Sequence, residues 1–177
     1  IPFKKGNIFS FSGRVFLLLL LASVLLTFGL GKYFTDTTEN RMMANIRVLA
    51  MSQAKMIASL DGIVSSVKDK DIPKLKIIAD KLNQDSSYDY VVIGDEHSIR
   101  LYHPNSEKIG YPMQWNKPGA LENGESYFIK GEGSMGNAVR AKTPIFDENG
   151  KVIGVVSIGY LTTKIDTSLA KIFVQTS

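Results

Sequence analysis

The sequence predicts an α+β protein with one transmembrane helix, a long amphipathic helix and a five-stranded antiparallel sheet, in that order. Three patterns predict this arrangement. An uncharged apolar run lies near the N-terminus, apolar residues recur at helical spacing up to about Leu82, and five short segments rich in β-branched and aromatic residues follow Tyr88. Because the helices come first and the strands follow in close succession, we expect one sheet with helices packed on one face.

The first element is the run from Val15 to Gly31, which contains no charged residue. At 1.5 Å per residue it spans about 26 Å, close to the thickness of a hydrocarbon core once the Lys32 side chain reaches the interface. A cleaved signal peptide is the alternative. The apolar region of such a peptide is shorter and is followed by small residues, whereas Gly31 precedes Lys-Tyr-Phe, so the pattern favours a transmembrane helix at 15–34.

Basic residues predict the orientation of this span in the membrane. Lys4, Lys5 and Arg14 lie on its N-terminal side, so the positive-inside rule predicts that residues 1–14 are cytoplasmic and that the rest is exported across the cell membrane. With Lys32 also set aside, the other 17 of the 21 basic residues match the 17 acidic ones. The exported part therefore has no net charge and is a poor nucleic-acid binder. The chain has no cysteine, which excludes disulfides and thiolate chemistry.

Helices are expected on both sides of the strands. Apolar residues at helical spacing over 36–66 predict a long amphipathic helix that continues from the membrane span. Residues 71–73, Asp-Ile-Pro, supply an N-cap and a first-turn proline for a second helix that ends near Leu82. The pattern is helical again over 164–177, which we expect to be the start of a second transmembrane segment, cut short. This leaves 35–163 as the extracytoplasmic domain.

Five strands are expected after the helices, separated by Gly, Asp, Asn and Pro. The polar connections at 94–98 and 147–150 are of hairpin type. The long insertion from Pro104 to Glu125 should cover one face of the sheet as a loop. The expected strands are Tyr88–Ile93, Ser98–His103, Ser126–Lys130, Ala138–Phe146 and Lys151–Tyr160.

Two cations on the fourth expected strand mark the candidate site. Arg140 and Lys142 are two residues apart, so on a strand they point to the same face, and their neighbours are apolar. Like charges on a half-buried face repel each other unless an anion lies between them. Isolated strand cations are usually solvated or salt-bridged, but this pair favours a binding site for a ligand rich in carboxylates.

Arg100 and His103 form a second candidate pair. Because they are three residues apart, a regular strand would point them to opposite faces. Pro104 ends the strand, and a bend there could bring both side chains to one rim. A lone histidine before a proline is more often structural, so the spacing alone leaves the role of His103 open.

The segment from Gly131 to Gly136 matches the G-x-G-x-x-G pattern of dinucleotide-binding folds. That fingerprint must open a helix, and here it precedes a strand, so we reject a dinucleotide cofactor. The glycines and Ser134 can instead offer N–H groups and a hydroxyl to an anion, and their position just before Arg140 favours this over an ordinary turn. We expect no cofactor, metal site or catalytic constellation, since the two histidines lack clustered carboxylates and Ser134 and Ser157 have no evident base.

Taken together, these motifs resemble the extracytoplasmic sensor domain of the citrate and C4-dicarboxylate sensor histidine kinases of the CitA and DcuS type, a PAS-like fold with a long N-terminal helix. The likeness covers Tyr88 to Thr163 in four ordered segments: Tyr-Val-Val-Ile-Gly-Asp, Arg-Leu-Tyr-His-Pro, Gly-Ser-Met-Gly with Ala-Val-Arg, and Gly-Lys-Val-Ile-Gly-Val-Val-Ser-Ile-Gly-Tyr. The resemblance implies a membrane-bound homodimer with a cytoplasmic kinase region, a response regulator as partner, and a piston-like signal through the second transmembrane helix.

The resemblance also implies which residues hold the ligand. Citrate sensors carry a lysine two residues after the arginine of the later strand, and Lys142 matches it, so the resemblance is closest to the citrate branch, CitA. Citrate has a third carboxylate, which makes a third cation chemically sensible. The positions that match the ligand-binding residues are Arg100, His103, Arg140, Ser134 and the backbone of its loop with Gly133 and Met135, together with Tyr90, Met113 and Ser157.

Three alternatives remain open at this point. The domain could sense a C4-dicarboxylate such as malate, succinate or fumarate, or it could be the ectodomain of a chemoreceptor. From a different class, it could be a membrane-anchored extracytoplasmic enzyme acting on a carboxylate. The sequence beyond Ser177 would separate a kinase from a chemoreceptor, and product formation from citrate would identify an enzyme.

Overall fold

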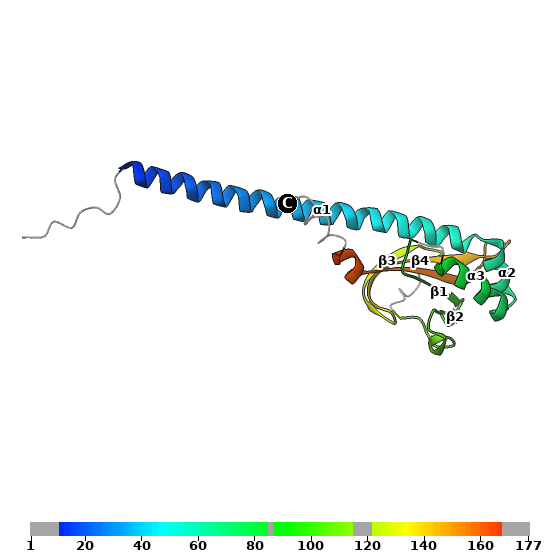
Figure 1. Cartoon of the computed structure of the whole chain (residues 1–177). Coiled ribbons are helices and arrows are strands. Elements are labelled where there is room, and N and C mark those ends of the chain that lie inside the picture. Colours follow the sequence, from blue (N-terminus) through cyan, green and yellow to red (C-terminus); the bar gives the residue numbers. More distant parts are fainter. Residues whose placement is uncertain (1–10, 85–86, 115–121, 168–177) are drawn as a thin grey trace, which may run out of the picture. The chain divides into compact units, whose positions relative to one another are not determined.

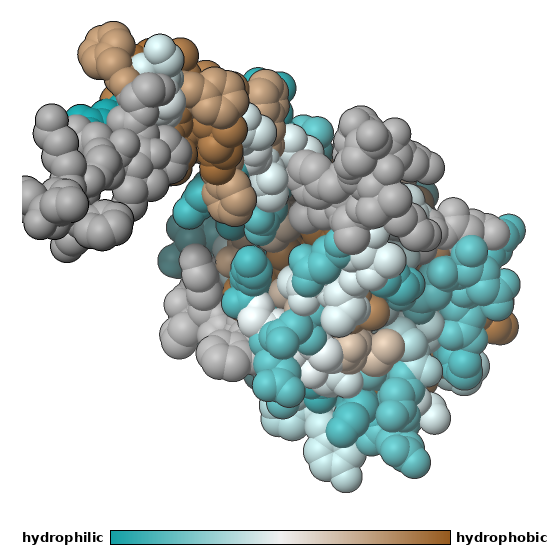
Figure 2. All heavy atoms as spheres, turned by 60° about the vertical axis from the view of Figure 1, so that its left-hand side comes forward, coloured by the Kyte–Doolittle hydropathy of each residue, from teal (hydrophilic) through white to brown (hydrophobic). Residues whose placement is uncertain are grey.

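The computed structural model describes residues 11–84, 87–114 and 122–167, which divide into two units at Met42/Met43. The first unit is the beginning of helix α1 (Phe11–Ala58), whose apolar side chains are exposed, as the brown spheres of Figure 2 show. An 18-residue window of α1 has a mean hydropathy of 2.2 and none of it is buried. By length and composition this helix can cross a membrane.

The second unit begins with the rest of α1, followed by α2 (Asp61–Lys68) and α3 (Ile72–Gln84). The expected continuity of the apolar span with an amphipathic helix is confirmed, but the expected end near Ser66 is wrong. Leu60 has extended backbone (φ −68°, ψ 124°), which breaks the helix. The Asp71 carboxylate accepts a hydrogen bond from the Lys74 N–H at 3.1 Å, which confirms the N-cap of α3.

Five strands form one antiparallel sheet: β1 (Tyr90–Asp95), β2 (Arg100–Tyr102), β3 (Tyr127–Gly133), β4 (Gly136–Phe146) and β5 (Val152–Leu161). Their order across the sheet is β2-β1-β5-β4-β3. Both short connections are closed as expected, because the side chains of Asp95 and Asp147 each accept two backbone N–H groups of their own turn. The predicted α+β class and the five-stranded antiparallel sheet are therefore confirmed.

Helices cover one face of this sheet (Figure 1). The Tyr160 hydroxyl on β5 donates to the Gln53 side chain of α1 at 2.8 Å, and Gly154 on β5 lies against Val67 of α2. Strand side chains alternate between faces, so every second residue of the central strands enters this core. The buried apolar residues that meet here are Ile57, Ile63, Val67, Leu75 and Ala79 from the helices and Val91, Ile93, Val139, Ile145, Val156 and Ile158 from the strands.

The opposite face carries polar side chains. The register places Arg140 of β4 beside Gly159 of β5 and Lys142 beside Ser157, while Tyr90 of β1 pairs with Gly159 from the other side. The chain after β2 returns along that strand, since the Arg100 N–H donates to the Tyr111 carbonyl at 3.1 Å. Met113 and Gln114 then line a cavity on this face, so part of the long insertion lies there, as expected, while residues 115–121 lie outside the described residues.

A hydrogen-bond network fixes α3 to the sheet. The Tyr102 hydroxyl donates to Asp80 at 2.8 Å and accepts from the Asn83 amide at 2.7 Å. The Asn83 carbonyl oxygen accepts from the N–H of Val91, which is fully buried, at 2.8 Å. Asn83 therefore joins β1, β2 and α3.

We expect Asn83→Ala to lower the free energy of unfolding by about 1–3 kcal/mol, because it leaves the buried Val91 N–H without its acceptor. Urea unfolding followed by circular dichroism measures this. The control is Asn149→Ala at an exposed turn position, which should change the free energy by less than about 0.5 kcal/mol. Equal values for the two variants would show that the network does not stabilise the fold.

Candidate functional site

A small cavity lies on the sheet face that the helices leave uncovered. Its described lining contains three cations and no carboxylate. Its volume is about 20 Å³, which is room for one water molecule, so a larger guest enters only if the walls move apart. The lining residues are Tyr90, Val92, Arg100, Met113, Gln114, Ser134, Arg140, Lys142 and Ser157.

Arg140 lies in β4 with 5% of its surface exposed. Its Nη2 donates to the carbonyls of Gly131 and Glu132 at 3.0 and 3.3 Å. Its Nε is buried and has no acceptor within the part of the chain that the structure describes. A guanidinium normally places all its N–H groups in hydrogen bonds, and it matches a carboxylate with two parallel bonds.

Lys142 is 1% exposed, and its ammonium donates to the Gln114 carbonyl at 2.8 Å. Burial, with the neighbouring charges of Arg140 and Arg100, lowers the pKa of Lys142 to about 7. The cause is physical: the interior disfavours the charged form, and two further cations disfavour it again. The three cations therefore act on one another inside one cavity.

A β-bulge in β2 decides where Arg100 and His103 point. Ile93 of β1 pairs with Tyr102 and the next residue, Gly94, pairs with Arg100, so Leu101 is one extra residue on β2. On a regular strand Arg100 and Tyr102 would face the same side. Because of the extra residue, Arg100 faces the cavity while Tyr102 contacts α3. Arg100 and His103 therefore do lie on the same side of the sheet, but the cause is this bulge and not the expected bend at Pro104.

His103 lies directly behind the cavity wall. Its Nε2 is 2.9 Å from the Ser134 hydroxyl, and its Nδ1 lies 2.9 Å from the Asn105 N–H and 3.0 Å from the Asn105 carbonyl. A neutral imidazole can accept from the Asn105 N–H, and a protonated one can donate to the carbonyl, so both charge states have a partner. Burial lowers the pKa of His103 below its usual 6.5. The hydrogen bond to the Asn105 backbone opposes this shift, and the charges of Arg100 and Lys108 add to it.

The glycine-rich segment is the tip of the β3–β4 hairpin, with Gly133 paired to Gly136. It ends β3 and begins β4, and so does not open a helix as a dinucleotide fingerprint must. A Cβ on Gly133 would lie 1.7 Å from Arg140 Nη1, so only glycine lets the guanidinium lie against the hairpin. Between the two glycines, Ser134 lines the cavity and Met135 packs against the apolar cluster beside it.

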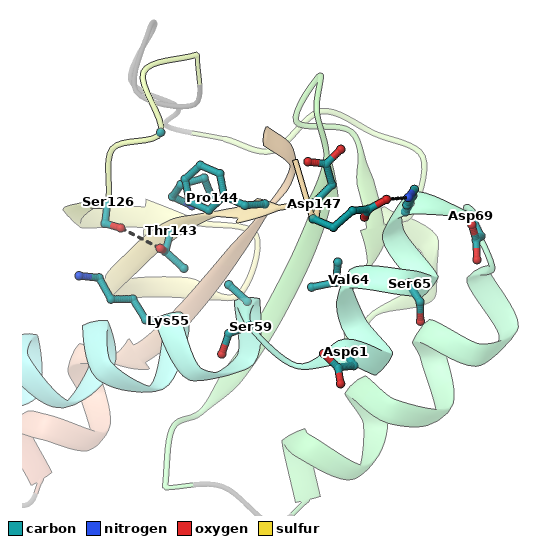
Figure 3. A pocket seen from close by; sticks show the side chains of 15 residues that line it. Lys55, Ser59, Asp61, Val64, Ser65, Asp69, Ser126, Thr143, Pro144 and Asp147 are labelled. Carbon is teal, nitrogen blue, oxygen red and sulfur yellow. Dashed lines mark hydrogen bonds and ion pairs between the residues drawn. The ribbon is translucent and has the colours of Figure 1, made fainter. Parts of the chain in front are cut away.

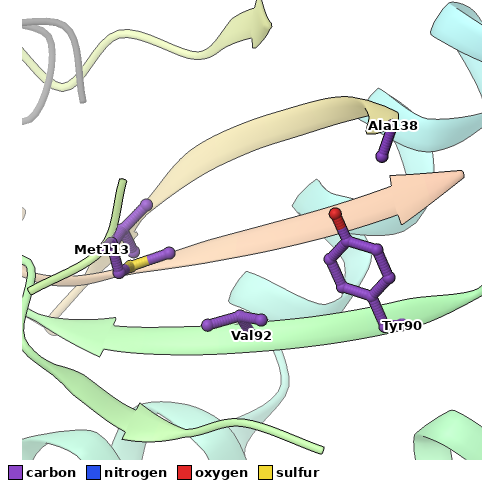
Figure 4. Packing of buried hydrophobic residues seen from close by; sticks show 5 residues of the cluster. Tyr90, Val92, Met113 and Ala138 are labelled. Atoms are coloured by element: carbon purple, nitrogen blue, oxygen red, sulfur yellow. The ribbon is translucent and has the colours of Figure 1, made fainter. Parts of the chain in front are cut away.

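That apolar cluster contributes Tyr90, Val92 and Met113 to the cavity lining and also contains Ala138 and Val155. Figure 4 shows Tyr90 and Val92 projecting from β1 and Ala138 on β4, with Met113 at the opposite end of the row from Tyr90. Burial raises the pKa of the Tyr90 hydroxyl, and nearby Arg140 opposes this shift, so the tyrosine and the guanidinium interact.

Two strand glycines make room for this cluster. A Cβ on Gly159 would lie 2.1 Å from Tyr90 Cζ, and one on Gly94 would lie 2.7 Å from Met113 Sδ. The Tyr90 ring and the Met113 sulfur therefore lie directly on the backbone of the sheet.

The structure brings the ten sequence-predicted site residues to this one place. Seven line the cavity, His103 bonds to one of them, and Gly133 and Met135 lie in the hairpin tip. Gln114, Gly94 and Gly159 were missed. A glycine inside a strand often marks a close approach and could have identified the last two, whereas no pattern identifies the carbonyl of Gln114.

A larger hollow of about 840 Å³ lies elsewhere, between the end of α1, α2 and the far end of β4 (Figure 3). It is open to solvent. Its Lys68 pairs with Glu148, and its lining holds four acids against two lysines, so the excess of negative charge disfavours an anion. The small cavity, whose described lining holds three cations and no carboxylate, is the better candidate for an anion.

Comparison with known proteins identifies the family of this chain. The model of the single cache domain 3 family (sCache_3_2) matches residues 32–174. Sensor histidine kinase DpiB of Escherichia coli K12 is 61% identical over 158 residues, which cover 89% of this chain and 29% of that protein. Sensor histidine kinase CitA of Klebsiella pneumoniae is 36% identical over 162 residues, 91% of this chain and 30% of that protein. The chain thus spans about three tenths of the length of these relatives.

Two solved structures share the fold. The crystal structure of the E. coli DcuS sensor domain has a TM-score of 0.62 and 28% identity, covering 72% of this chain and 96% of that one. The sensor domain of the Vibrio cholerae histidine kinase DctB has a TM-score of 0.57 at 11% identity, covering 76% of this chain and 60% of that one, and supports the fold alone. The chain therefore belongs to the single cache domain family, as a PAS-like sensor domain homologous to those of the CitA and DcuS type sensor histidine kinases.

Proposed function

We propose that this chain is the extracytoplasmic input domain of a membrane-bound sensor histidine kinase and that it binds citrate in the small cavity. The observation that carries the proposal is the cluster of Arg100, Arg140 and Lys142 in a buried cavity whose described lining has no carboxylate. Burying several like charges without a counter-charge is costly, and a polyanionic ligand offsets that cost. The Arg140 Nε–H, which has no acceptor in the described residues, offers such a ligand a further hydrogen bond.

A tricarboxylate is favoured over a dicarboxylate by the number and placement of the cations. Lys142 lies two residues along β4 from Arg140, and Arg100 approaches from the strand at the sheet edge, so three carboxylates can each meet a different cation. A C4-dicarboxylate remains the second candidate, since relatives named DcuS and a probable C4-dicarboxylate sensor kinase of Bacillus subtilis are 30% and 27% identical to this chain.

The proposal extends to the role of the longer protein. The apolar part of α1 anchors the domain in the cell membrane, with residues 1–14 cytoplasmic, and a second span begins within 164–177. The protein is a homodimer that passes the signal by a piston-like shift to a cytoplasmic kinase region and on to a response regulator. A chemoreceptor would carry methylation helices instead, and an enzyme would convert citrate, whereas a sensor releases it unchanged.

The Arg140→Ala variant tests the site. Truncating one partner of a buried charge pair costs about 2–5 kcal/mol, so we expect citrate affinity to fall by at least about 30-fold. Titration calorimetry measures the affinity, and Lys130→Ala, an exposed cation on the neighbouring strand, is the control. Normal citrate binding by Arg140→Ala would place the ligand elsewhere.

Lys142→Met tests the choice of ligand. It keeps the length of the side chain and removes its charge, so citrate should lose about 1.5–3 kcal/mol of binding free energy while malate, which has no third carboxylate, loses much less. The ratio of the two affinities, measured by calorimetry on the same preparation, gives the answer. Equal losses for citrate and malate would refute the tricarboxylate argument.

The depressed pKa of Lys142 predicts proton uptake on binding. The amine has a pKa of about 7 in the free site, and an adjacent carboxylate raises it, so the complex holds more protons than the free protein at and above pH 7. Citrate affinity should therefore fall as the pH rises through 7, with His103 adding to the same trend at lower pH.

Calorimetry in buffers of different ionisation enthalpy counts these protons. We expect Lys142→Met to take up fewer protons than the unsubstituted chain above pH 7, and the protonation of citrate itself cancels in this comparison. An identical proton count in both proteins would exclude Lys142 as the group that titrates.

A further inference from the structure

One carboxylate holds the end of β5 and the helical turn that follows it. Asp89, the residue before β1, has a side chain that is 12% exposed. Its Oδ2 accepts the Leu161 N–H at 2.6 Å, and its Oδ1 pairs with the Lys164 ammonium. Residues 162–167, the last described part of the chain, are therefore tied to the start of β1.

A second tie reaches the same segment from the hairpin side. The Thr162 hydroxyl donates to the Asn137 carbonyl at 3.2 Å, and Asn137 pairs with Glu132 at the base of the hairpin tip. The Leu161 side chain, like that of Met135, packs against the apolar cluster beside the cavity. The segment thus contacts both strands that flank β5.

Both ties begin next to cavity residues. Asp89 precedes Tyr90, and its N–H donates to the Gly159 carbonyl at 3.0 Å. Gly159 pairs with Tyr90 on one side and Arg140 on the other. On the hairpin side, Arg140 bonds to the carbonyl of Glu132, the pairing partner of Asn137. A shift of Tyr90 therefore reaches the end of β5 and Lys164 through Asp89 alone, and a shift of Arg140 reaches Thr162 through Glu132 and Asn137.

We propose that Asp89 is a positioning residue that transmits movement of the cavity walls to residues 162–167. This inference rests on the proposed function. A ligand carboxylate that binds the Arg140 guanidinium competes with the Gly131 and Glu132 carbonyls for its N–H groups. The 20 Å³ cavity must also widen to admit the ligand. Tyr90 and the hairpin then move, and the Asp89 carboxylate carries that movement to Leu161 and Lys164. The ligand shifts the segment because it favours one of two arrangements of these contacts.

The test measures the movement and the binding separately. In the full chain in lipid, Asp166→Cys and Lys151→Cys, both at exposed positions, take spin labels in a protein with no native cysteine. Citrate should change the distance between the labels, and Asp89→Ala should abolish that change. If Asp89→Ala only uncouples the segment, citrate no longer has to move it, so by linkage the citrate affinity stays equal or rises. A merely structural defect lowers both the citrate affinity and the melting temperature.

Three variants serve as comparisons. Glu148→Ala removes the ion pair with Lys68 at the other end of the domain and should keep the full distance change. Asp89→Asn keeps an acceptor for the Leu161 N–H and loses only the charge. Lys164→Ala removes the other partner of the ion pair and leaves the bond to the Leu161 N–H, so both variants should retain part of the distance change. These two variants also decide the question if Asp89→Ala does not fold.

The outcomes separate the inference from the proposed function. No binding heat with citrate in the unsubstituted chain refutes the proposed function. Normal binding with an undiminished distance change in Asp89→Ala refutes the role of Asp89 alone. A loss of citrate affinity in Asp89→Asn also overturns it, because Asp89 would then belong to the binding site itself.

Discussion

The mutual repulsion of three buried cations is the constraint on which the rest of this structure depends. Arg100, Arg140 and Lys142 line one small cavity, and the pKa of Lys142 falls to about 7 because of burial and its two neighbours. The carbonyls of the β3–β4 hairpin and of Gln114 accept hydrogen bonds from these groups, which offsets part of the cost. Carbonyl dipoles do not neutralise a charge, which is why we propose a polyanion as the ligand.

The fold supplies a rigid base for that cluster. Helices bury one face of the sheet with aliphatic side chains, so the strands that carry the cations are held from behind. On the open face, Gly159 and Gly133 lack the Cβ atoms that would displace Tyr90 and the Arg140 guanidinium. The backbone itself therefore forms the floor, and polar groups from six different segments converge over it. Movement of any of them reaches the contacts that Asp89 makes at the end of β5.

Periodic patterns in the sequence predicted what depends on periodicity. The two-residue spacing of Arg140 and Lys142 correctly placed both on one face, and the segments rich in β-branched and aromatic residues between Gly, Asp, Asn and Pro located all five strands to within a few residues. The extra residue at Leu101 could not be foreseen, because a bulge leaves no periodic trace and reverses the side that the next residues face. The break of the long helix at Leu60 was also hidden, since the apolar spacing continues across it.

The central claim is that the buried guanidinium of Arg140 receives a ligand carboxylate, and the Nε–H of Arg140 reports on this directly. Proton–nitrogen NMR spectra of arginine side chains, with the Arg140 signal identified by Arg140→Lys, follow it during titration with citrate. The account predicts a strong downfield shift of the Nε–H proton and slower exchange with water, because an acceptor now bonds it. An Arg140 signal that stays unchanged while other signals show saturating citrate binding would contradict the account.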